Sequence, residues 1–88
     1  MVWTLEYADS AKSALRKLDP QTARRILDFM DERIAGEQNP RRSGKALSGP
    51  LGAFWCYRVG ACRVICDIQD ATLRVLVLQV GHRREVYR

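Results

Sequence analysis

The sequence predicts an α+β domain with the element order β-α-α-β-β-β, in which a helical hairpin packs on one face of an antiparallel-rich sheet. Two consecutive segments in the first half repeat their apolar residues every three to four positions, as amphipathic helices do. Apolar and polar residues alternate before these segments and again in the last third of the chain, which is typical of strands. A stretch rich in glycine and proline separates the two parts.

The chain begins with an expected strand over residues 2–7, in which Val, Thr and Glu alternate with Trp, Leu and Tyr. Asp9 is a suitable N-cap for a short helix over residues 10–18, because its carboxylate can accept hydrogen bonds from the first turn. The apolar residues of this helix fall on one stripe: Ala11, Ala14, Leu15 and Leu18.

A second helix is expected from Pro20 to about Ala35, with Asp19 as its N-cap and proline at its first position. Gly36 is the expected left-handed residue that ends it. Its apolar stripe consists of Ala23, Ile26, Leu27, Met30 and Ile34. Because only a tight turn separates the two helices, they are expected to form a hairpin.

The last part of the chain is expected to form three strands, at residues 53–59, 62–69 and 72–80. Residues 37–52 are expected to be a loop without regular structure, because two prolines and three glycines interrupt them. The tail, residues 81–88, follows the last strand.

A two-residue turn at Gly60 and Ala61 sets the register of the first two of these strands, since glycine at the first turn position suits a tight hairpin. One sheet face is then almost entirely apolar and is expected under the helices. It holds Trp55, Tyr57, Val59, Cys62, Val64, Cys66, Ile68, Leu73, Val75 and Val77. The other face mixes cations with apolar residues and is expected to stay open. It holds Phe54, Cys56, Arg58, Arg63, Ile65, Asp67, Arg74, Leu76 and Leu78.

The same register places Arg58 directly opposite Arg63 on the open face. Like charges that face each other across a strand pair destabilise a sheet, so folding alone gives no reason for this arrangement. An anionic ligand would give one. The aromatic residues Trp3, Trp55 and Tyr57 are most simply core residues.

The composition indicates a single globular domain over residues 1–88, with 47% apolar and 28% charged residues. The net charge is +5, and twelve of the fifteen cationic residues are arginine, which favours binding to phosphate groups and bases. The sequence has no apolar run of membrane-spanning length and no secretion signal at its start, so we expect a cytoplasmic protein without membrane contact.

The three cysteines form neither a CxxC motif nor an even disulfide set. On the expected strands Cys62 and Cys66 share one face while Cys56 points to the other, so the three thiolates cannot converge on a metal ion. They are interpreted as small buried apolar residues in a reducing compartment.

Three segments resemble the RelE/ParE superfamily of bacterial toxins, and specifically its RelE branch. They are Lys45-Ala-Leu-Ser-Gly49, the hairpin Trp55-Cys-Tyr-Arg-Val-Gly-Ala-Cys-Arg-Val-Ile65 and the ending Val80-Gly-His-Arg-Arg-Glu-Val-Tyr87. The resemblance implies a helical hairpin on an antiparallel sheet. It also implies an mRNA endonuclease that cuts message on the ribosome with the substrate 2′-hydroxyl as nucleophile, without a metal or other cofactor.

The resemblance also assigns candidate site residues. It implies that the catalytic RNA site consists of Arg58, Arg63, Arg83 and Tyr87. Arginines suit the stabilisation of a phosphorane, because they stay protonated and present fixed donors. Tyr87 suits proton transfer or stacking on a base. Further expected RNA contacts, which a solvated loop or a structural histidine would equally explain, are Lys45, Arg41, Arg42 and His82.

The expected partners are a RelB-like antitoxin, the ribosome and mRNA. The chain departs from the family pattern where Cys56 replaces a frequent basic residue and Cys62 a frequent aromatic one, and it ends without an extra helix. No strong general base is visible in the sequence. Two other interpretations stay open: a ParE-like inhibitor of DNA gyrase on the same fold, and a non-catalytic member that only binds an antitoxin.

Overall fold

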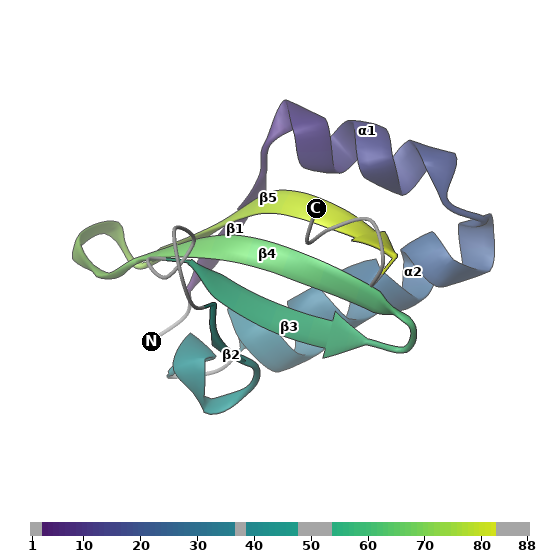
Figure 1. The fold of residues 1–88 in the computed structure, drawn as a ribbon. Helices are drawn as coiled ribbons and strands as arrows, with labels where there is room; N and C mark the ends of the chain where they lie inside the picture. Colours follow the sequence, from purple (N-terminus) through teal and green to yellow (C-terminus); the bar gives the residue numbers. More distant parts are fainter. Residues whose placement is uncertain (1–2, 37–38, 48–53, 83–88) are drawn as a thin grey trace.

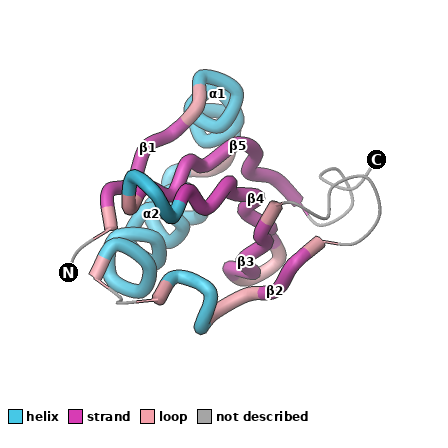
Figure 2. Tube along the Cα trace, turned by 90° about the vertical axis from the view of Figure 1, so that its left-hand side faces the viewer, coloured by secondary structure: helices cyan, strands magenta, loops and turns pink. Residues whose placement is uncertain are grey.

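The computed structural model describes residues 3–36, 39–47 and 54–82, and the predictions for residues 1–2, 37–38, 48–53 and 83–88 lie outside the described part. Two α-helices cover one face of a five-stranded sheet whose strand order is β1-β5-β4-β3-β2 (Figures 1 and 2). The strands are β1 (Thr4–Tyr7), β2 (Lys45–Ala46), β3 (Trp55–Val59), β4 (Cys62–Gln69) and β5 (Arg74–His82), and the helices are α1 (Asp9–Lys17) and α2 (Pro20–Phe29). The α+β class with its helical hairpin is therefore confirmed.

The sheet is mixed, because β1 pairs in parallel with β5 while the other neighbouring strands are antiparallel. Figure 1 shows α2 crossing behind the sheet and α1 lying along β5. Neither α-helix lies on the opposite face, which we call the open face (Figure 2). None of the helices in the described ranges is long and apolar enough to cross a lipid bilayer.

The two helices differ in how they begin. The expected cap at Asp9 is wrong, because Ala8 is the N-cap and Asp9 is the first helical residue. Its carboxylate still lies in the first turn, where it interacts favourably with the helix dipole. The cap at Asp19 is confirmed: its carboxylate accepts a hydrogen bond from the Thr22 amide at 3.0 Å, and Pro20 follows at the first helical position.

Helix α2 continues after Phe29 as one π-helical segment, Met30–Ala35, whose Met30 and Ile34 are completely buried. The expected left-handed stop at Gly36 is wrong, because its φ is −85°. The amide of Trp3 donates to the carbonyl of Ala35 at 3.2 Å. The Ala35 carbonyl at the end of the helix therefore has a hydrogen-bond partner in Trp3, and it does not need a left-handed cap.

The expectation of an irregular segment over residues 37–52 is also wrong within residues 39–47. Pro40–Arg42 form a 3₁₀ turn, and β2 adds a fifth strand beside β3, with Lys45 opposite Cys56 and Ala46 opposite Trp55. The φ of Gly44 is +76°, which allows the chain to turn from the 3₁₀ segment onto the sheet edge.

The core lies between the helices and the face of the sheet that the alternation predicted. Its sheet residues include Tyr57, Val59, Cys62, Val64, Cys66, Val75 and Val77, packed against Ala11, Ile26, Met30 and Ile34 from the helical layer. Trp3 belongs to this core and Trp55 packs against it, so all three aromatic residues are core residues as expected.

The expected bounds of the last strand are shifted, and its alternation changes within the strand. A 3₁₀ turn at Asp70–Thr72 and a left-handed Leu73 (φ 50°) delay the start of β5 to Arg74. Ile65 pairs with Gln79 and Cys66 with Val77, so Leu78 is an extra residue in a β-bulge. The bulge puts Val80, three positions after Val77, in the helix-side core, so the strict alternation of this strand ends at Leu78.

Candidate functional site: a cationic cavity on the open face

Arg58 and Arg63 face each other as the sequence predicts. Val59 pairs with Cys62 around the turn, Gly60 has a φ of +60°, and Arg58 pairs with Arg63. Because the pair that closes a two-residue hairpin is hydrogen-bonded, the next pair is a non-hydrogen-bonded one, in which Cα atoms approach to about 4.5 Å. Arg58 is exposed and Arg63 is half-buried. The two guanidinium groups are therefore held at the same end of the same face.

Strand β2 brings a third cation to this place. Lys45 lies directly opposite Cys56, which is two positions from Arg58 and so shares its face. A cavity of about 290 Å³ is lined by Gly44, Lys45, Cys56, Arg58 and Arg63. No carboxylate is among these lining residues, so the cavity is an electropositive site. We call it the cationic cavity.

Several contacts fix the segment that carries Lys45. The Trp55 indole donates to the carbonyl of Ser43 at 2.7 Å, and the Tyr57 hydroxyl donates to the carbonyl of Pro40 at 2.7 Å. A Cβ atom on Gly44 would lie only 2.3 Å from the carbonyl oxygen of Cys56. Only glycine thus lets the chain pass so close to β3, and this passage places Lys45 at the cavity.

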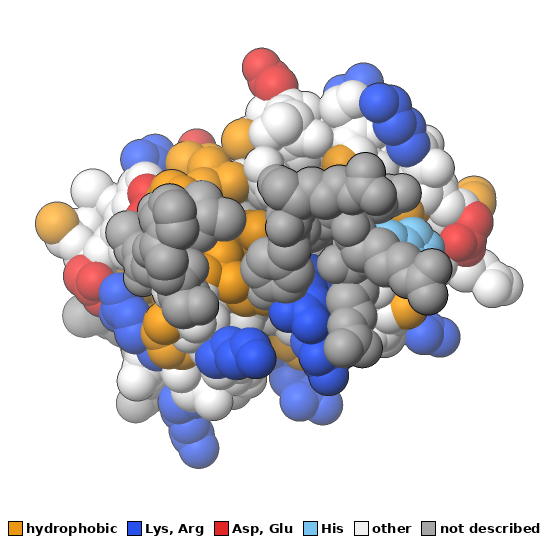
Figure 3. Space-filling model, viewed as in Figure 1, with side chains coloured by type: hydrophobic (Ala, Val, Ile, Leu, Met, Phe, Trp, Pro, Cys, Tyr) orange, Lys and Arg blue, Asp and Glu red, His pale blue; other side chains and the backbone are white. Residues whose placement is uncertain are grey.

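An apolar cluster lies on the same face as these cations and forms the floor beside the cationic cavity. Leu47, Cys56 and Ile65 are buried in a small second cluster on the open face, and Phe54 packs against it. Figure 3 shows lysine and arginine side chains gathered on this face next to an apolar patch. An apolar floor lowers the local dielectric constant, so it strengthens the attraction between the cations and a bound anion.

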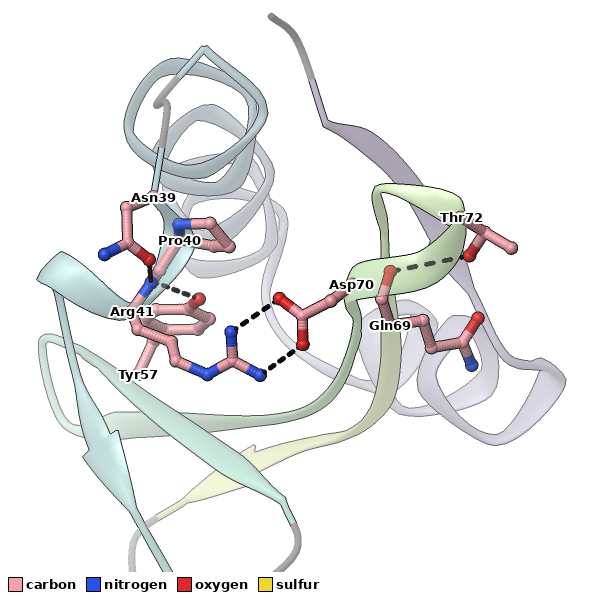
Figure 4. Close-up of polar contacts among 7 residues, drawn as sticks. All are labelled: Asn39, Pro40, Arg41, Tyr57, Gln69, Asp70 and Thr72. Carbon is pink, nitrogen blue, oxygen red and sulfur yellow. Dashed lines mark hydrogen bonds and ion pairs between the residues drawn. The ribbon is translucent and has the colours of Figure 1, made fainter.

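Arg41 does not join the cationic cavity. Its guanidinium donates two hydrogen bonds to the carboxylate of Asp70, at 2.8 and 2.9 Å (Figure 4). These hydrogen bonds hold the pKa of Asp70 below its ordinary value and raise that of Arg41. Asp70 lies seven positions beyond Arg63 along the chain, which corresponds to about 23 Å at about 3.3 Å per residue. This ion pair therefore joins the Pro40–Arg42 segment to the end of the sheet where β4 turns into β5.

The other expected RNA contacts are not among the described residues that line the cavity, or lie outside the described part of the chain. His82 pairs with Cys62, a residue of the helix-side core, and lines a cavity of about 690 Å³ together with α1 residues such as Ser13 and Lys17. Arg42 is exposed on the 3₁₀ segment. Arg83 and Tyr87 lie outside the described residues.

The cysteines take the faces that the alternation predicted. Cys62 and Cys66 belong to the helix-side core, and Cys56 to the open-face cluster. Burial raises the pKa of Cys66 far above its ordinary value, so its thiol stays protonated. Burial likewise raises the pKa of the Tyr57 hydroxyl, which is occupied as a donor to Pro40. Neither group is suited to acid–base chemistry at neutral pH.

The family is shown by sequence comparison. A model described as the ParE toxin of type II toxin-antitoxin systems, parDE, matches residues 5–87. The chain belongs to this toxin family, within the RelE/ParE superfamily that the sequence motifs indicated. It is 31% identical over 88 residues to Toxin RelG of Mycobacterium tuberculosis (strain ATCC 25618 / H37Rv), with 100% of this chain and 99% of that relative covered. The protein is thus a toxin of a type II toxin–antitoxin pair.

Solved structures agree with this assignment. The toxin–antitoxin complex RelBE2 of Mycobacterium tuberculosis matches with a TM-score of 0.86 and 27% identity, over 97% of this chain and 95% of that chain. The archaeal RelE–RelB complex of Pyrococcus horikoshii OT3 matches with a TM-score of 0.73 and 23% identity, over 98% and 100% of the two chains. The isolated E. coli RelE toxin, at 20% identity, a TM-score of 0.71 and coverages of 97% and 90%, supports the fold alone. The archaeal structure, at 23% identity, likewise supports the fold alone, and an antitoxin as partner follows from the family itself.

Proposed function

We propose that this toxin is an endoribonuclease that cuts mRNA on the ribosome. The observation that carries the proposal is the cationic cavity, where Lys45, Arg58 and Arg63 line one space and no carboxylate is among the described lining residues. A phosphodiester is the anion that best fits three cations beside an apolar floor, because guanidinium groups bind phosphate oxygens through paired hydrogen bonds. The resemblance of the chain to RelE-like toxins supports the same conclusion.

In the proposed reaction the 2′-oxygen of the substrate attacks the adjacent phosphorus, and the bond from phosphorus to the 5′-oxygen breaks. The 2′-hydroxyl loses its proton, the 5′-oxygen gains one, and the intermediate phosphorane carries extra negative charge. Arg58 and Arg63 stabilise this charge as fixed donors, and Lys45 adds a mobile ammonium group. A single donor of this kind contributes about 10²–10³ in rate.

None of these three cations is a general base, since arginine and lysine stay protonated at neutral pH. Tyr87, outside the described residues, is the proposed proton-transfer or stacking group. The ribosome contributes by holding the message so that the 2′-oxygen, the phosphorus and the leaving oxygen are in line. Orientation of this kind replaces a large part of the catalysis that a strong base would supply.

The test uses purified toxin on ribosomes programmed with a defined message. We expect cleavage at the codon in the A site, and no cleavage when the nucleotide before the scissile phosphate carries a 2′-deoxy or 2′-O-methyl group. Arg63→Ala is expected to reduce the cleavage rate by about 10²-fold or more. Cleavage of the 2′-deoxy message at an unchanged rate would exclude the proposed nucleophile.

Inhibition of DNA gyrase is the second candidate, because the matching family model is described as a ParE toxin. A supercoiling assay run beside the cleavage assay separates the two functions. Inhibition of gyrase at toxin concentrations that leave ribosome-bound message intact would favour this second candidate.

A further inference from the structure

The chain has three lysines, and they lie in different surroundings. Lys12 and Lys17 belong to α1, whereas Lys45 belongs to β2. All three side chains are exposed. Lys17 lines the cavity beside His82, whose lining includes the carboxylate of Asp19. Lys45 lines the cationic cavity, whose described lining residues include two arginines and no acidic residue.

The strand register brings the Lys45 amine within reach of both arginines. Lys45 lies directly opposite Cys56, and Arg58 is two positions farther along β3 on the same face. Diagonal neighbours of this kind have Cβ atoms about 7–8 Å apart, a distance that long side chains span. Arg63 faces Arg58 on the next strand. The amine and the two guanidinium groups can thus contact one small ligand at the same time.

The size and the charge of the cationic cavity select a small anion. Its volume of about 290 Å³ is at the lower end of the range of about 300–1,000 Å³ that ligand pockets have. Asp67, a carboxylate on the same sheet face, is four positions from Arg63 along β4, which corresponds to about 13 Å at about 3.3 Å per residue. Guanidinium groups bind phosphate oxygens through paired hydrogen bonds. A phosphate group with a small substituent therefore fits the cavity.

A lysine amine beside a bound phosphate is a nucleophile as well as a cation. Within the described part of the chain, no hydrogen bond or ion pair engages the Lys45 side chain. If the bound phosphate carries an acyl group, the carbonyl carbon is separated from the phosphorus by a single bridging oxygen. The two arginines would then hold this carbon beside the amine. Such placement raises the rate of a reaction that is otherwise bimolecular.

We propose that Lys45 is a site of acetylation, and that the acyl donor is a small acyl phosphate which Arg58 and Arg63 hold in the cationic cavity. The modification itself stands on the cavity alone. Its consequence rests on the proposed function, because acetylation removes the charge of one of the three cations that are proposed to bind the RNA phosphate.

In this reaction the neutral form of the Lys45 amine attacks the carbonyl carbon of the acyl phosphate. A bond forms from the nitrogen to this carbon, the bond from the carbon to the bridging oxygen breaks, and inorganic phosphate leaves with that electron pair. The departing phosphate takes the proton that the nitrogen loses. The arginines stabilise the negative charge that develops on the carbonyl oxygen and on the leaving group.

The test follows the acetylation of purified toxin by acetyl phosphate, with each lysine quantified by mass spectrometry of proteolytic peptides. We expect Lys45 to be acetylated at least tenfold faster than Lys12 and Lys17, and inorganic phosphate to slow the reaction at Lys45 alone. Acetyl-coenzyme A is the matched donor, because a long arm separates its phosphates from its thioester. It should acetylate the three lysines at similar rates.

A pair of double variants isolates the contribution of the two arginines. Arg58→Gln/Arg63→Gln should lower the rate at Lys45 to that of the α1 lysines, because the phosphate is no longer held. Arg16→Gln/Arg24→Gln is the matched control, since it removes the same charge from exposed positions of α1 and α2. It should leave the preference for Lys45 unchanged.

Three results would overturn the proposal. They are equal rates at the three lysines with acetyl phosphate, a preference for Lys45 that persists in the Arg58/Arg63 variant, and the same preference with acetyl-coenzyme A. The phosphate competition and the comparison of donors use the wild-type toxin, so they decide the question even if a variant fails to fold.

Binding of fluorescein-labelled oligouridylate, measured by fluorescence anisotropy, tests the consequence separately. We expect treatment with acetyl phosphate to weaken RNA binding at least threefold in the wild type and to have no effect in Lys45→Met. An unchanged RNA affinity of toxin that is acetylated at Lys45 would reject the consequence and count against the proposed RNA site. The modification would stand in that case, because mass spectrometry measures it without RNA.

Discussion

The two ends of the sheet use the same residue type in opposite ways. At the end formed by the β4–β5 turn, Arg41 is held by Asp70, and Arg74 donates to Glu6 at 2.8 Å. At the hairpin end, Arg58 and Arg63 face each other across the strands, and none of the described residues that line their cavity is a carboxylate. An arginine that is held by a described carboxylate is explained by the fold, whereas two arginines that face each other across a strand pair are what an anionic ligand would explain.

The repulsion between Arg58 and Arg63 is moderate because Arg58 is exposed to solvent. Two like charges about 4 Å apart repel by about 1 kcal/mol in bulk water and by about 4 kcal/mol at the effective dielectric constant near a protein surface. A folded protein tolerates a local repulsion of this size. A phosphodiester bound between the two arginines would be attracted to both and would outweigh their repulsion. The comparison of the two ends therefore leads to four tests, which begin with the largest expected effect.

Alanine at one arginine from each end tests the contrast most strongly. Arg63→Ala should lower the rate of message cleavage on ribosomes by about 10²–10³-fold, because it removes a donor to the phosphorane. Arg41→Ala removes only the ion pair with Asp70 and should change the cleavage rate by less than about threefold. Equal losses in the two variants, measured by primer extension at matched concentrations of folded toxin, would remove the distinction between the ends.

Gly44→Ala tests how the fold places Lys45. The left-handed backbone and the 2.3 Å approach to the Cys56 carbonyl should make this change destabilising by about 1–3 kcal/mol. Gly36→Ala is the matched control, because its φ is −85° and its Cβ would meet only the Glu32 carbonyl at 3.5 Å. Urea denaturation measures both variants. If Gly44→Ala and the control unfold at the same urea concentration, Gly44 does not lie as close to the Cys56 carbonyl as the structure shows.

Lys45→Met tests the third cation of the cavity through the salt dependence of binding. A lysine that contacts an RNA phosphate releases about 0.7 of a counterion for single-stranded RNA, so its loss should lower the slope of log affinity against log salt by that amount. Lys12→Met, on exposed α1, is the control and should leave the slope unchanged. An unchanged slope in Lys45→Met would remove Lys45 from the site.

The smallest expected effect concerns the ion pair between Arg41 and Asp70. The pKa of Asp70 is lowered by its hydrogen bonds from Arg41, so the ion pair stabilises the fold above the ordinary aspartate pKa of about 4 and this contribution is lost as the pH falls below it. Asp70→Asn should therefore lower the melting temperature slightly at pH 7, by an amount that shrinks as the pH falls below about 4. A difference in melting temperature between the variant and the wild type that grows as the pH falls would contradict this explanation.

The hairpin could be predicted from the sequence because its determinants are local. Gly60 and Ala61 fix the turn, the turn fixes the register, and the register places Arg58 opposite Arg63. Strand β2 could not be predicted, because it depends on the distant hydrogen bonds of Trp55 and Tyr57 to the 3₁₀ segment. Lys45 was named as an RNA contact from the motif, but only the structure shows that it lies beside the arginines.

Two further features depend on tertiary packing. The bulge at Leu78 shifts the end of β5 by one residue, and this shift turns His82 toward α1 rather than toward the arginines. A cavity of about 880 Å³ between α2 and β3, whose lining includes Phe29 and Arg58, arises only when α2 packs beside β3. Basic and acidic residues alternate along α2 in the sequence, but solvated helix faces usually have the same pattern, so it does not predict this cavity.

The most direct measurement is a cryo-EM structure of the toxin on a ribosome whose message carries a 2′-O-methyl group at the cleavage site to prevent cutting. The account requires a message phosphate in the cationic cavity, within hydrogen-bonding distance of Arg63 and with Arg58 and Lys45 around it. A message that runs past Arg41 or along the helical side, with the cavity facing away from the RNA, would contradict it.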